Sequence, residues 1–121
     1  MGIKSYRDLE VWQKAMDMVV DCYQVAGKVP RNELYGLAGQ LQRASVSVPS
    51  NIAEGRARQH TKELLHYLSM AYGSLAEVET LMQIAERLGY IDSSEVCRIL
   101  DQTAEIGRMI NGLCRSIRKR F

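Results

Sequence analysis

The sequence has few histidines and cysteines, the residues on which many catalytic and metal sites depend. It contains two histidines, His60 and His66, and three scattered cysteines, Cys22, Cys97 and Cys114, with no CxxC pair. A Ser-His-Asp or Cys-His catalytic arrangement would need one of the two histidines, and none stands out. A zinc site or a disulfide framework needs paired cysteines, so neither is indicated. We expect reduced, largely buried thiols, no metal or cofactor, and no enzyme activity.

Glu63 and His66 have the Glu-x-x-His spacing by which di-iron bundles direct two ligands inward. Such a site needs a second pair of the same kind. The residue three before His60 is Ala57, which cannot bind a metal. We therefore expect His66 to lie at the surface or at an interface.

Long apolar runs and an excess of charge of one sign are also absent. No stretch of about 18 apolar residues occurs, and the N-terminus lacks the apolar core of a signal peptide. Lys and Arg number 16 against 14 Asp and Glu, so the formal net charge of +2 does not by itself require a nucleic-acid partner. With 46% hydrophobic residues, the chain is expected to form one domain over residues 1–121. We expect a cytoplasmic protein with no membrane partner.

Apolar residues recur at helical spacing along almost the whole chain, and no strand candidate has comparable support. The first predicted helix follows Ser5 and Asp8, which we interpret as an N-terminal cap pair, and it ends at Gly27 and Pro30. One face of this helix carries a stripe of large apolar side chains: Leu9, Trp12, Met16, Val19 and Tyr23.

The second predicted helix begins near Asn32, a good N-cap, and continues to a connection at 57–61. Pro49 lies inside this helix and removes the amide hydrogen bond to the carbonyl of Ser45, so the helix is expected to bend there. Three serines near the bend have hydroxyls that can bond freed backbone carbonyls: Ser45, Ser47 and Ser50.

The third predicted helix runs from Thr61 to about Leu88, and Gly89 follows it as a C-cap glycine. Asp92 and Glu95 resemble a capping box for a fourth helix, which continues nearly to the C-terminus.

Short connections at 27–32, 57–61 and 89–92 favour antiparallel packing of consecutive helices. We therefore predict an all-α fold, an up-down-up-down antiparallel four-helix bundle. The third helix has a wider apolar surface than the stripe of roughly 100° that a bundle member needs. Excess apolar surface usually meets another subunit, so we also predict a homo-oligomer with the third helix or its neighbour partly in the interface.

Asn51 and Glu54 lie three residues apart and share a helical face near one end of the predicted bundle. One interpretation is a recognition or acid–base pair. The other, which we favour, is a structural hydrogen-bonded network to a neighbouring helix through Gly73 and Ser74, because a catalytic pair needs a pocket and a third partner.

Two stretches of the chain, residues 56–62 and 115–120, are basic and contain no acidic residue. Charge runs of this kind usually form solvated faces, but they also suit contacts with the phosphates of a nucleic acid. Arg43 is a further candidate, either for such contacts or for a subunit contact. The candidate nucleic-acid-binding residues are Arg43, Arg56, Arg58, Lys62, Arg115, Arg118, Lys119 and Arg120.

Four blocks of residues occur in order along nearly the whole chain. They are Leu9-x-Val11-Trp12-x-x-Ala15, Tyr35-Gly36-Leu37-x-x-Gln40-x-x-Arg43-Ala44, Ser47-Val48-x-x-Asn51-Ile52-Ala53-Glu54-Gly55 and Tyr72-Gly73-Ser74-x-x-Glu77. Together they resemble the four-helix-bundle family of 23S ribosomal RNA intervening-sequence proteins, and the Asn-Ile-Ala-Glu-Gly block is quite specific. Val48 stands where that family usually has isoleucine, which is a mild change.

The resemblance implies up-down bundles that associate as pentameric rings or barrels. It also implies a relation to the accessory variability protein of diversity-generating retroelements, a basic pentamer that binds nucleic acid and its reverse transcriptase. Many members of the family have no established activity, and the intervening-sequence name records where some of the genes lie.

Two functions remain open from the sequence. The first is a non-catalytic homo-oligomeric protein that binds RNA or DNA through clustered basic residues. The second is a structural or scaffold ring that binds a protein partner and has no nucleic-acid role. The first predicts salt-sensitive, mostly sequence-independent affinity, whereas the second predicts no nucleic-acid binding near physiological salt.

Overall fold

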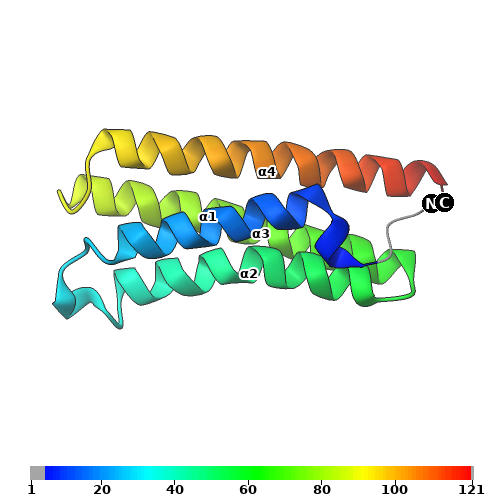
Figure 1. The fold of residues 1–121 in the computed structure, drawn as a ribbon, viewed down its shortest axis with the longest axis horizontal. Helices are drawn as coiled ribbons and strands as arrows, with labels where there is room; N and C mark the ends of the chain where they lie inside the picture. The colour runs from blue at the N-terminus through cyan, green and yellow to red at the C-terminus, as the bar shows by residue number, and fades with distance from the viewer. Residues whose placement is uncertain (1–4, 121) are drawn as a thin grey trace.

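The computed structural model describes residues 5–120, which form four long helices packed side by side (Figure 1). The helices are α1, Glu10–Ala26; α2, Leu37–Ala57; α3, Thr61–Arg87; and α4, Ser93–Arg120. Two short 3-10 helices, Tyr6–Asp8 and Arg31–Glu33, precede α1 and α2. Each long helix packs against the next along the chain, and α4 also packs against α1. The predicted antiparallel four-helix bundle is therefore confirmed.

The core lies between the four helices and is mainly aliphatic. The apolar stripes of all four helices meet there, and removing them from water is the main favourable contribution to folding. The largest fully buried side chains among residues 5–120 include Met18, Leu41, Ile52, Leu68, Met82, Ile99, Ile106 and Ile110.

The connection between α3 and α4 follows the signals in the sequence. Gly89 has a φ of +79°, a left-handed conformation that glycine adopts without steric cost, directly after the end of α3. The Asp92 carboxylate accepts the amide hydrogen of Glu95 at 3.0 Å, which caps α4. Hydrogen bonds from the Ser94 hydroxyl and from the Glu95 amide hold the pKa of Asp92 below its usual value. The Glu95 carboxylate forms an ion pair with Lys28, just beyond the end of α1.

The second helix begins later than the sequence suggests, at Leu37 rather than near Asn32. Residues 31–33 form a 3-10 turn, and Gly36 then has a φ of −101° and a ψ of −113°, which is not helical backbone. The prediction was wrong because the apolar spacing continues from Leu34 to Leu37 although the backbone turns between them.

Ser5 caps a different helix from the one predicted. Its hydroxyl accepts the amide hydrogen of Arg7 at 3.0 Å, so it caps the 3-10 helix Tyr6–Asp8. The chain is extended at Leu9, and α1 begins only at Glu10. The short 3-10 turn therefore separates the cap from the long helix.

α1 carries two apolar stripes, and the one evident in the sequence faces the core only in part: Leu9 is buried, and Trp12 and Val19 pack against the core. The core stripe includes Ala15, Met18 and Cys22, which are fully buried. By contrast, Met16 and Tyr23 are 42% and 46% exposed. The outer stripe therefore borders the core at Trp12 and Val19 and reaches solvent at Met16 and Tyr23.

α2 continues as a helix through Pro49. The Ser45 hydroxyl is fully buried and donates to the Gln42 carbonyl at 2.9 Å. The Ser47 hydroxyl lies 2.8 Å from the Ser74 hydroxyl on α3. The Ser45 hydroxyl therefore bonds the preceding turn of α2, and the Ser47 hydroxyl bonds α2 to α3.

The three cysteines differ in exposure. Cys22 and Cys114 are buried and Cys97 is exposed on α4, so the expectation of largely buried thiols holds for two of the three. Burial raises the pKa of the Cys22 thiol to about 12, and the nearby charge of Asp21 adds to the rise. Burial also raises the pKa of Cys114, and the charge of Arg118 opposes this effect.

Thiol alkylation should distinguish the three cysteines. Only the thiolate reacts readily, so iodoacetamide at mildly alkaline pH is expected to modify Cys97 quickly and the two buried thiols only after unfolding. Mass spectrometry of the intact protein should show a single adduct per native chain and full modification in denaturant. Rapid modification of Cys22 in the native protein would contradict its position in the core.

Candidate nucleic-acid interface

One end of the bundle collects both basic stretches of the chain. Because consecutive helices are antiparallel, the end of α2, the start of α3 and the end of α4 lie together (Figure 1). Residues 56–62 and 115–120, far apart in the sequence, are therefore neighbours in space. We name this region the basic end, and it contains Arg56, Arg58, Lys62, Arg115, Arg118, Lys119 and Arg120.

The last turns of α4 supply four exposed basic side chains to the basic end. Within residues 5–120, none of these four forms an ion pair with an acidic side chain. The C-terminal end of a helix carries partial negative charge, which stabilises cations there and lets the fold tolerate the cluster. Their charges face solvent and can meet an anionic partner. The four residues are Arg115, Arg118, Lys119 and Arg120.

Arg58 differs from these side chains because carboxylates already oppose its charge. Its Nη2 donates to Glu54 at 3.0 Å and to the Tyr67 hydroxyl at 2.8 Å, and its Nη1 lies 3.7 Å from Glu63. The guanidinium also stacks on the Tyr67 ring, 5.1 Å from the ring centre. The hydrogen bond to Glu54 is the main cause of a raised pKa for Arg58. We name these four residues the Arg58 cluster, and they join the end of α2 to the first turns of α3.

Arg43 lies on α2 away from the basic end. It is 13 positions before Arg56 on the same helix, which corresponds to about 20 Å. The Arg43 guanidinium points back along α2 toward Gly39. A Cβ built on Gly39 would lie only 3.2 Å from the Arg43 Nη1 atom. The structure therefore does not bring Arg43 together with the other candidate basic residues.

The polar residues singled out in the sequence belong to two separate groups. The side-chain amide of Asn51 donates to the carbonyl and hydroxyl oxygens of Ser47 at 2.8 and 2.9 Å, and Ser47 in turn contacts Ser74 on α3. Glu54 belongs instead to the Arg58 cluster. We did not identify Ser47 from the sequence as the residue that connects Asn51 to Ser74. Its position four residues before Asn51 places the two side chains on the same helix face, which could have indicated the contact.

A cavity of about 590 Å³ lies at the basic end, and we name it the end cavity. Aliphatic side chains, including the fully buried Ile52 and Leu68, form one part of its lining, and polar side chains form the other. The aliphatic part consists of Leu9, Ile52, Leu64, Leu68, Leu113 and Ile117. The polar part consists of Arg56, Arg58, Gln59, His60, Thr61, Ser116 and Arg120.

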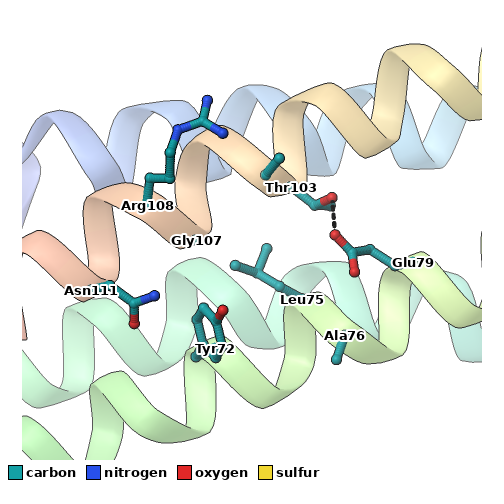
Figure 2. Close-up of a pocket in the computed structure, with 9 residues that line it drawn as sticks. Tyr72, Leu75, Ala76, Glu79, Thr103, Gly107, Arg108 and Asn111 are labelled. Atoms are coloured by element: carbon teal, nitrogen blue, oxygen red, sulfur yellow. Dashed lines mark hydrogen bonds between the residues drawn. The ribbon is translucent and has the colours of Figure 1, made fainter.

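A smaller cavity of about 330 Å³ lies between α3 and α4 (Figure 2). Its lining includes three small residues, Ala76, Ala104 and Gly107. The Thr103 hydroxyl donates to the Glu79 carboxylate at 2.6 Å across this cavity, and Figure 2 shows the Arg108 side chain extending away from Tyr72. Thr103 and Glu79 are thus paired with each other, and the end cavity, which is larger and has three arginines in its lining, is the stronger candidate for a binding site.

The described part of the chain, residues 5–120, brings no three His, Cys, Asp or Glu side chains close enough to hold a metal ion. His66 is exposed, and its ring meets the Tyr67 ring edge-on with 5.8 Å between centres. In the same part of the chain, no helix has a long enough apolar stretch to span a bilayer.

Comparison with known families agrees with the fold and with the sequence blocks. The sequence matches the 23S rRNA-intervening sequence protein family over residues 7–112. The chain belongs to this family.

Among solved structures, this family member is similar to a protein of unknown function from the S23 ribosomal protein family of Bacteroides thetaiotaomicron. The TM-score is 0.80 at 20% sequence identity, and the match covers 86% of this chain and 97% of the other. At 20% identity, this structural similarity shows that the two chains share a fold and no more. No curated protein matches the chain.

This 23S rRNA-intervening sequence protein also has an apolar surface that its own fold covers only in part. The outer stripe of α1 meets apolar residues of α2 in a shallow groove, and Val20 on this surface is 57% exposed. We name it the outer apolar face, and it consists of Tyr6, Trp12, Met16, Val19, Val20, Tyr23, Val46, Pro49 and Ala53.

Proposed function

We propose that this 23S rRNA-intervening sequence protein is a non-catalytic homo-oligomer that binds nucleic acid through phosphates at its basic end. The observation that supports the proposal most strongly is the convergence of two distant basic stretches at one end of the bundle. Contacts between phosphates and Lys or Arg give affinity that is largely independent of sequence.

Fewer residues are expected to contact phosphates than the sequence alone suggests. The expected contacts omit Arg58, whose charge is opposed by Glu54 and Glu63, and Arg43, which lies about 20 Å away along α2. The proposed phosphate contacts are Arg56, Lys62, Arg115, Arg118, Lys119 and Arg120.

Assembly would strengthen binding by repeating the basic end. A net charge of +2 per chain gives +10 for five copies, the number that the family resemblance implies. Two different apolar surfaces are present, the outer apolar face and a group on α3 that includes the exposed Met70, Ile84 and Leu88. If one of these surfaces contacts the other surface on the next copy, the contact is heterologous, and such contacts form a ring when the rotation between copies closes.

α3 offers a further feature that suits such a contact. Gly73 lies in the middle of α3 on an exposed face, and a Cβ built there would meet no atom within 4 Å. Glycine in a helix interior costs about 1 kcal/mol relative to alanine, and nothing within this chain requires it. Close approach of another copy to the α3 backbone would explain why the position lacks a side chain.

The salt dependence of binding tests the nucleic-acid proposal. Affinity for a labelled RNA should fall steeply between about 50 and 200 mM salt, because each neutralised phosphate releases counterion. The double variant Arg118→Gln/Lys119→Gln should bind more weakly, and the slope of log affinity against log salt should become shallower by about 2 for each chain in contact. Fluorescence anisotropy titrations at several salt concentrations would measure both effects.

The matched control is Arg31→Gln/Arg87→Gln, which removes the same charge at the opposite end of the bundle. We expect it to leave the salt slope close to that of the wild type. Absence of binding at low salt, or affinity that does not change with salt, would contradict the proposal. That result would favour the alternative of a scaffold ring that binds a protein partner.

A further inference from the structure

The end cavity has a composition that phosphate binding alone does not explain. A site for phosphate needs cationic and hydrogen-bonding groups, yet the aliphatic part of this cavity reaches side chains as deep as Ile52 and Leu68. Its volume of about 590 Å³ lies in the range of sites that hold small molecules or single building blocks of a polymer. The ligand that fits should therefore combine an anionic group with an apolar body.

The anionic group has donors along the polar part of the cavity. Arg56 and Arg120 come from α2 and α4, so two helices provide cations to one space. α3 begins at the same place, with His60 as its N-cap and no hydrogen bond from the His60 side chain to the first turn. Amide hydrogens at the start of a helix add to the attraction for an anion that the arginines create.

The remaining polar residues indicate the nature of the apolar body. Gln59, Thr61 and Ser116 place an amide and two hydroxyls along the lining of the same cavity. A simple acyl chain could not use these hydrogen-bonding groups, so it matches only the aliphatic part of the lining. A nucleobase has apolar faces for the aliphatic side chains and a polar edge for the amide and hydroxyls.

We propose that the end cavity binds one unpaired nucleotide, with its phosphate at Arg56 and Arg120 and its base against the aliphatic side chains. The inference rests on the proposed function, since it adds a local specificity to nucleic-acid binding at the basic end. In a duplex both faces of a base are covered by stacked neighbours, so only an unpaired nucleotide can enter. The protein should therefore prefer nucleic acid with single-stranded ends or loops.

Two RNA probes with equal numbers of phosphates test this preference, one a blunt duplex and the other a shorter duplex with an unpaired overhang. The wild-type protein should bind the overhang probe about tenfold more tightly, in line with the contribution of one base held against protein side chains. Ser116→Phe fills the cavity from α4 without changing charge, and it should reduce the ratio of the two affinities to about one. Its affinity for the blunt duplex and its salt slope should stay at wild-type values.

Ser93→Phe makes the same substitution at an exposed position of α4 at the opposite end of the bundle, and it should keep the preference. Thr61→Trp fills the cavity from α3 and provides a second variant should Ser116→Phe fail to fold. Equal affinity of the wild type for both probes, or an unchanged preference in both cavity-filling variants, would overturn the inference while leaving the proposed function intact. Absence of binding to either probe would overturn the proposed function and the inference together.

Discussion

Gly55→Ala is expected to lower the free energy of unfolding by about 1–3 kcal/mol, the usual cost of adding a methyl group to a filled site. Gly55 is buried in the last turns of α2, where Leu64 and Tyr67 of α3 pack against it. A Cβ at this position would lie 2.8 Å from the Tyr67 Cβ and 3.3 Å from the Leu64 carbonyl oxygen. Neither atom is the end of a flexible side chain, so the two helices would have to move apart. Equilibrium denaturation in urea would measure the loss.

Gly73→Ala provides the matched control, because it makes the same change in a helix where a Cβ meets no atom within 4 Å. Measured in separate chains, for which the Val20→Glu variant described below provides the background, it should raise stability by about 0.5–1 kcal/mol, because alanine favours helix. Equal effects at the two positions would show that helix propensity, and not the contact with Tyr67, governs Gly55. Movement of Tyr67 would also disturb the Arg58 cluster, in which its hydroxyl donates to Glu54 at 3.1 Å.

Val20→Glu is expected to convert the proposed homo-oligomer into single chains of 13.7 kDa. Val20 is 57% exposed in the single chain, so a carboxylate there remains hydrated and the fold should persist. In an assembly that covers the outer apolar face, the same carboxylate would be buried without a partner, which is costly. Light scattering coupled to size-exclusion chromatography would measure the mass, and circular dichroism would confirm the helical content.

Gln40→Glu adds the same charge at an exposed position of α2 outside the outer apolar face, and it should leave the assembly intact. A wild-type protein that elutes as a single chain at micromolar concentration would contradict the assembly itself. Persistence of the assembly in Val20→Glu would place the contact on another surface.

The sequence was most informative where local chemistry determines local structure. Gly89 and Asp92 marked the end of α3 and the start of α4, because a left-handed glycine and a capping carboxylate act within a few residues. The gathering of residues 56–62 and 115–120 also follows from the sequence once the helices are known to be antiparallel.

The sequence was less informative where contacts between distant segments decide the outcome. α1 has two apolar stripes, and spacing alone could not show that Ala15 and Met18 face the core while Met16 lies outside. The pairing of Arg58 with Tyr67 depends on the turn between α2 and α3, which periodicity does not describe. The end cavity likewise requires three helix ends in one place, and no single stretch of sequence contains it.

The exposed thiol of Cys97 gives this protein a natural attachment point for a fluorophore. It lies 23 positions before Arg120 on α4, or about 35 Å along a straight helix. A donor dye on Cys97 and an acceptor on the end of an RNA strand would therefore be separated by a distance suited to resonance energy transfer. Such a pair would report which end of the bundle the strand approaches, without altering any basic residue.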